Sequence, residues 1–239
     1  METRLKLILR QIHWSLALKA FILAVVWLFL PRWAFLVLSF YFYLVPVFHP
    51  GKLFLPFLVF LFLAFEGPTN PGFAVILGLL FYIILGIKDL ILIDRRSAYD
   101  ILVLVLMFVL YIRFFSGFGD SLGYLPVISI FLLSAVLCLL YGGFLSYGSG
   151  EGSSAGERGG SKVVLGLVWL LISQMSLAII FLPLNFIYQS ALAFFLSAII
   201  FGLASAYLNG TVTRERILIN FSVVFVFLVL ILGSVQWGL

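Results

Sequence analysis

The sequence predicts an all-α polytopic transmembrane helix bundle of about nine spans, with the N-terminus in the cytoplasm and the C-terminus outside. Three observations predict it: composition, long apolar runs, and cations in alternate loops. Hydrophobic residues make up 64% of the 239 residues and charged residues 10%, and the mean hydropathy is +1.28. Soluble domains are roughly 45–50% apolar and about 25% charged. A soluble globular fold, a disordered chain and a nucleic-acid-binding protein are therefore excluded.

Nine apolar stretches, separated by short polar segments, are the expected helices. A full crossing needs about 20 apolar residues to cover about 30 Å of hydrocarbon. The second and third stretches are short, so a re-entrant hairpin over 33–66 is an alternative that would leave seven spans. In chain order the stretches are 14–30, 33–48, 53–66, 73–93, 98–115, 123–147, 163–184, 187–208 and 217–236.

Capping patterns mark several boundaries of these stretches. Asn70 followed by Pro71 predicts an N-cap and the first helical position of the fourth stretch. Ser161 is expected to cap the seventh stretch. Asn209-Gly210 is expected to end the eighth stretch in a left-handed cap.

The cations predict the orientation. With the N-terminus inside, twelve of the 14 Lys and Arg residues fall on the inner side, as the positive-inside rule requires. Only Arg32 and Arg113 fall outside. The inner cations are Arg4, Lys6, Arg10, Lys19, Lys52, Lys88, Arg95, Arg96, Arg158, Lys162, Arg214 and Arg216. The net charge of +5 is thus interpreted as an orientation signal and not as the mark of an acidic partner.

The expected organisation is two membrane units joined by a linker. Residues 1–147 form a six-span unit. Its first dozen residues are expected to form a short interfacial helix on the anionic inner leaflet, and the alternative is that they extend the first span. Residues 148–161 contain six Gly and four Ser, which predicts a flexible cytoplasmic linker. Residues 162–239 form a three-span unit. The expected location is a bacterial-type cytoplasmic membrane, in which the protein is integral.

Ionisable residues at membrane depth give the candidate polar site, which comprises Lys19, Lys88, Asp89 and Arg96. The lysines can snorkel to the interface, but the short side chain of Asp89 cannot do so easily. Lys88 is not expected to be its partner, because adjacent helical residues point about 100° apart. Arg96 and Lys19 are the expected partners. The alternatives are a structural ion pair, an ion, proton or substrate site open to the cytoplasm, and an Asp89 that lies in the interface.

Small residues at four-residue spacing predict two closely packed helix faces, inside the bundle or between protomers. The first face lies in the sixth stretch and gives the single cysteine a packing role. The second lies in the eighth stretch. Their residues are Ser134, Cys138, Gly142 and Ser146, and Ala198, Gly202 and Ala206.

Catalytic and metal-binding motifs are missing from the sequence. It has no HExxH or CxxC pattern, and its only histidines are His13 and His49. One cysteine excludes an intrachain disulfide and a multi-cysteine metal site. No catalytic residue, cofactor or metal is therefore predicted.

Three functions fit these observations. The first is a transport component, or one that handles lipids or small solutes. The second is a structural or accessory subunit of a membrane protein complex. The third is an intramembrane enzyme acting on lipid-linked substrates. The expected partners are the lipid bilayer and, through the small-residue faces, other membrane proteins or further copies of the chain; nucleic acid is not expected.

Overall fold

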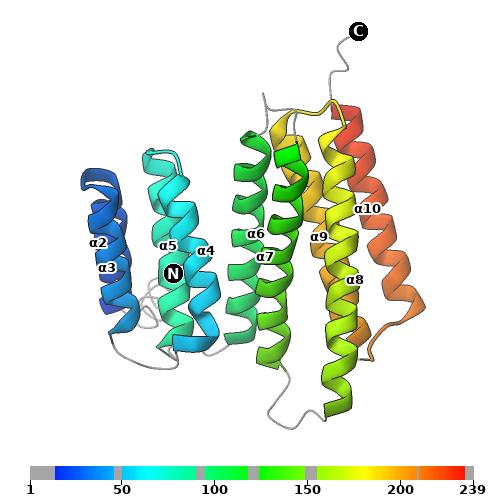
Figure 1. Ribbon diagram of the computed structural model, residues 1–239, viewed down its shortest axis with the longest axis horizontal. Helices are drawn as coiled ribbons and strands as arrows, with labels where there is room; N and C mark the ends of the chain where they lie inside the picture. Colours follow the sequence, from blue (N-terminus) through cyan, green and yellow to red (C-terminus); the bar gives the residue numbers. More distant parts are fainter. Residues whose placement is uncertain are drawn as a thin grey trace, which may run out of the picture. The chain divides into compact units, whose positions relative to one another are not determined.

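The structure is a computed structural model that describes residues 14–45, 50–89, 95–117, 124–148, 155–208 and 210–234. Within these ranges the chain forms helices joined by short turns, with no strand, which confirms the all-α prediction (Figure 1). The predicted interfacial helix in the first dozen residues lies outside them. The helices are α2 Trp14–Phe29, α3 Arg32–Leu44, α4 Pro50–Glu66, α5 Pro71–Lys88, α6 Arg95–Ser116, α7 Tyr124–Gly148, α8 Ala155–Ile180, α9 Phe186–Leu208 and α10 Arg214–Ser234.

Four of the described helices have the length and composition needed to cross a membrane. They are α5, α6 over Ser97–Ser116, α8 over Lys162–Ile180, and α9. In contrast, the 13 residues of α3 cover only about 20 Å. The count of nine crossings and the orientation stay predictions.

The first of two compact units, Met1–Leu106, contains a closed ring of helices. The helix α2 packs on α3, α3 on α4, and α4 on α5, and α5 packs back on α2. At Gly78 of α5, an added Cβ atom would lie 3.4 Å from the Cβ of Ala24 on α2, an ordinary van der Waals distance. Small residues on both helices therefore let α2 and α5 pack closely here.

The C-terminal end of α4 is completed by side chains from the helices that precede it. The last carbonyls of a helix have no partner within it. Trp27 of α2 donates its ring N–H to the carbonyl of Ala64 at 2.9 Å. Arg32 of α3 donates to the carbonyls of Phe65 and Gly67, and its guanidinium lies 5.6 Å from the centre of the Phe65 ring. One cation that the sequence places on the outer side therefore has a structural role.

The second unit, Met107–Leu239, contains the rest of α6 and the helices α7 to α10. Consecutive helices pack in a series: α7 on α8, α8 on α9, and α9 on α10. The ring centres of Phe195 on α9 and Phe227 on α10 are 3.6 Å apart. Helices on both sides of the predicted linker thus pack directly against each other.

Two predicted helix caps are confirmed. The Asn70 side chain accepts a hydrogen bond from the backbone N–H of Phe73 at 2.7 Å, with Pro71 at the first helical position. After α9, Gly210 has a φ of 65°, and its N–H bonds to the carbonyl of Tyr207. The N–H of Thr211 bonds to the carbonyl of Ala206, which completes a Schellman motif.

Two helix boundaries differ from the predicted ones. The helix α8 begins at Ala155, so Ser161 lies inside it and the predicted cap is wrong; residues 155–161 of the expected linker are helical. Extending a formed helix by one residue costs much less than starting one, so an apolar span can carry a glycine-rich extension. The helix α5 ends at Lys88, although the fourth stretch was expected to run to residue 93. Residues 90–94 lie outside the described ranges.

Both units expose large apolar side chains and bury several polar ones. Phe21, Phe29 and Phe62 of the first unit are exposed, as are Phe221 and Phe225 of the second. The polar residues that are buried include several serines and one lysine. Soluble proteins seldom expose so much contiguous apolar surface. The surfaces therefore agree with the long apolar helices in indicating a membrane-embedded protein.

Candidate functional site

Lys88 is a charged side chain buried in the first unit. It is the last residue of α5 and only 2% exposed. A cation at a helix C-terminus is favoured by the helix dipole. The preceding residues Ile84, Leu85 and Ile87 are fully buried, so this end of α5 lies inside the unit and not at its surface.

Asp89 forms an ion pair with Lys88 across 3.7 Å between Nζ and Oδ1. The expectation that these neighbours would not pair is therefore wrong. Asp89 is the cap that follows α5, and its N–H still bonds to the carbonyl of Leu85 at 2.8 Å, as in a helix. The long, flexible side chain of Lys88 can reach the adjacent carboxylate.

The pair leaves hydrogen-bonding capacity unused. Within the described part of the chain, neither Lys88 Nζ nor Asp89 Oδ1 has a hydrogen-bond partner, and both atoms are buried. Their separation of 3.7 Å is longer than an N–H···O bond of about 2.7–3.2 Å. A strong donor and a strong acceptor therefore lie side by side, each able to bind one further group.

Aromatic rings fix the lysine in place. The Nζ atom of Lys88 lies 5.3 Å from the centre of the Tyr43 ring, a cation–π arrangement. Tyr43 on α3 is stacked on Phe57 of α4, with ring centres 4.0 Å apart. Phe57 and Phe81 both face Phe60, so the rings continue across α4 to α5. Three helices thus position the ammonium group.

The other two residues of the predicted site contribute differently. Lys19 on α2 is half-buried, and its positive charge repels that of Lys88. The side chain of Arg96 lies outside the described residues. Tyr43 was not predicted for the site, and the only sequence signal for it is the aromatic run at 40–43.

The predicted small-residue faces are in contrasting surroundings. On α7, Ser134 and Cys138 are buried, and an added Cβ at Gly142 would lie 3.4 Å from Leu165 of α8. The side chain of Ser146 lies outside the description. On α9, Ala206 is buried and Ala198 half-buried. Gly202 is exposed, and an added Cβ there would meet no atom within 4 Å.

A group of buried hydroxyls in the second unit was not predicted. The hydroxyl of Tyr111 on α6 lies 2.6 Å from Ser197 Oγ on α9. Ser190, one helical heptad before Ser197, donates to the carbonyls of Tyr111 and Phe186. Their seven-residue spacing in an apolar span is the signal that could have revealed them. Because these hydroxyls bond to one another or to backbone carbonyls, they connect helices and are not free for chemistry.

Neither a metal site among the described residues nor a match to a known protein points to a function. Among the described residues, no three His, Cys, Asp or Glu side chains are grouped closely enough to hold a metal ion. No protein family model matches the chain, and neither a curated protein sequence nor a solved structure matches it. Among the described residues, the Lys88–Asp89 pair is therefore the candidate functional site.

Proposed function

We propose that the protein is a membrane transport component for a small polar solute, with the Lys88–Asp89 pair as its polar site. One observation carries this proposal: Nζ and Oδ1 are buried, 3.7 Å apart and without hydrogen-bond partners among the residues that the structure describes. Ionisable groups at membrane depth are costly, and those that persist mark ion, proton and substrate pathways. A solute group that accepts from Lys88 and donates to Asp89 would satisfy both atoms.

The proposed topology gives this site its direction. With the N-terminus inside and nine crossings, the end of α5 that carries Lys88 faces the cytoplasm of a bacterial-type membrane. The inner position of Lys88 follows from the same placement of cations that orients the chain. The site would then exchange solute with the cytoplasm.

Flux measurements on the full chain in liposomes test the proposal. The probes are protons, read by a trapped pH-sensitive dye, sodium ions, read by a trapped sodium dye, and radiolabelled phosphate. We expect the wild type to pass at least one probe under an imposed membrane potential. Asp89→Asn should lower that flux by about tenfold or more, because a charge-assisted contact is worth roughly 1.5–3 kcal/mol.

Glu215→Gln is the matched control, because Glu215 is an exposed carboxylate on α10 in the other unit. It should leave the flux unchanged. Equal flux through wild type and Asp89→Asn would remove the pair from the transport path. A wild type that passes none of the probes would contradict the transport function itself.

An accessory subunit is a second candidate, and it is favoured by the exposed Gly202 on α9. Open space beside a glycine within a span is where a helix of another protein can approach closely. Purification in mild detergent should then bring down a stoichiometric membrane protein, and Gly202→Leu should release it. A monodisperse chain without a partner would contradict this function.

A further inference from the structure

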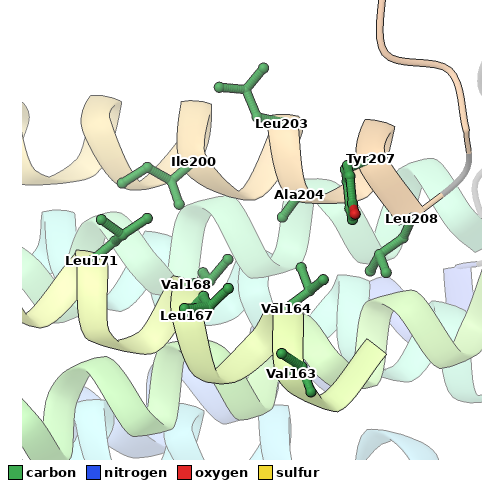
Figure 2. Close-up of a pocket in the computed structure, with 10 residues that line it drawn as sticks. All are labelled: Val163, Val164, Leu167, Val168, Leu171, Ile200, Leu203, Ala204, Tyr207 and Leu208. Carbon is green, nitrogen blue, oxygen red and sulfur yellow. The ribbon is translucent and has the colours of Figure 1, made fainter. Parts of the chain in front are cut away.

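An open apolar groove runs between α8 and α9 in the second unit, with a volume of about 1010 Å³ (Figure 2). Val163 and Leu167 belong to its α8 wall, and Tyr207 and Leu208 belong to its α9 wall. The lining residues of each helix follow a spacing of three or four, so each helix presents one face to the groove. The volume is at the upper end of the roughly 300–1,000 Å³ found for small-molecule sites.

The groove has a buried floor and exposed walls. Val168 and Ala204 are 4% and 7% exposed and close its base. Val163, Leu167 and Tyr207 are each more than half exposed and stand along its sides. Such a groove can hold a flexible apolar chain along its length while one side remains open.

Cations flank one end of the groove along the chain. Lys162 immediately precedes Val163 and is exposed. Arg214 begins α10, a short turn after Leu208, and is also exposed, as is its acidic neighbour Glu215. Over residues 155–162 and 209–216 the sequence has four cations and two acids. This end of the groove therefore favours a negative group.

We infer that the groove binds an anionic phospholipid, with an acyl chain between α8 and α9 and its phosphate beside Lys162 and Arg214. The apolar floor and walls match the hydrocarbon, and the charge at the end matches the headgroup. Cationic residues near a membrane surface attract anionic lipid by about fivefold in affinity each. The site is distinct from the Lys88–Asp89 pair and does not depend on its function.

Lipid titration of the full detergent-solubilised chain, followed by native mass spectrometry, tests the inference. The probes are phosphatidylglycerol and phosphatidylcholine with the same acyl chains. Phosphatidylglycerol should bind more tightly. Lys162→Gln and Arg214→Gln should each lower the affinity for phosphatidylglycerol by about fivefold and leave the affinity for phosphatidylcholine nearly unchanged. Arg113→Gln, which removes a charge on α6, should change the affinity for neither lipid.

Variants that fill the groove test the acyl chain. Leu167→Trp should weaken both lipids, whereas Leu170→Trp should not, because Leu170 is on α8 but does not line the groove. If Leu167→Trp fails to fold, Leu203→Trp on the opposite wall makes the same test. Equal binding of the two lipids would overturn the inference, as would equal effects of the two α8 tryptophans. A dimer that Leu167→Trp dissociates would also overturn it.

Discussion

The Lys88–Asp89 pair makes a sharp prediction about stability. Asp89→Asn removes the charge 3.7 Å from an ammonium group that is itself fully buried. At an effective dielectric constant of about 20, the attraction lost is about 4.5 kcal/mol. Breaking a buried pair from one side typically costs about 3–5 kcal/mol, because the remaining charge has no compensation. Since Asp89 is 12% exposed, we expect the lower end, about 3 kcal/mol.

A double-mutant cycle measures this coupling. Lys88→Met should lower the free energy of unfolding by only about 1–2 kcal/mol, less than Asp89→Asn does. The carboxylate that it leaves behind, Asp89, is the more exposed partner and can reach water or take up a proton. Combining Lys88→Met with Asp89→Asn removes both charges and should recover most of the stability lost by Asp89→Asn alone. The assay is the loss of helical circular dichroism as the detergent-solubilised protein is titrated with sodium dodecyl sulfate.

Glu215→Gln again serves as the control, because an exposed carboxylate contributes little. Its unfolding midpoint should match that of the wild type. If the effects of the two single substitutions simply add in the double variant, the two charges do not stabilise each other. Such additivity would refute a stabilising ion pair between Lys88 and Asp89, even if each single variant were destabilised.

Five further substitutions test three helix contacts through thermal unfolding in detergent. Gly78→Ala should be tolerated, since its Cβ fits against Ala24, whereas Gly78→Leu should cost about 1–3 kcal/mol by separating α2 from α5. Trp27→Phe should cost about 1 kcal/mol, because a carbonyl near the end of α4 loses its donor. Tyr111→Phe should cost about 0.6–2 kcal/mol by removing the bond from α6 to α9, and Tyr41→Phe, at an exposed position, should be neutral. An unfolding midpoint equal to that of the wild type for Gly78→Leu, Trp27→Phe or Tyr111→Phe would contradict the corresponding contact.

The features that the sequence predicts well depend on a few neighbouring residues. The Asn70 cap needs only its own side chain and the proline that follows, and the turn at Gly210 needs a residue that tolerates positive φ. The all-helical class follows from composition, because backbone groups in lipid must be satisfied within the segment. These are local or global properties, and neither requires knowledge of which helices meet.

The features that the sequence does not predict depend on distant contacts or on a helix end. The hydrophobic run continues past Lys88, so hydropathy alone extends the helix beyond its end, and the pairing with Asp89 depends on the conformation of the lysine side chain. Tyr43 reaches Lys88 from another helix, 45 positions earlier in the chain. The hydroxyl contacts of Tyr111 with α9 are likewise set by packing. No spacing rule relates residues on separate helices.

The way α4 ends has a consequence for the order of assembly. Its last carbonyls receive donors from Trp27 and Arg32, which both precede α4 in the chain. Because synthesis proceeds from the N-terminus, these donors are already present when the acceptors emerge. A buried carbonyl left without a donor costs about 1–3 kcal/mol, so the sequence order spares the nascent protein that intermediate. A circular permutant that begins at α4 would retain every one of these contacts in its folded state and still insert less efficiently.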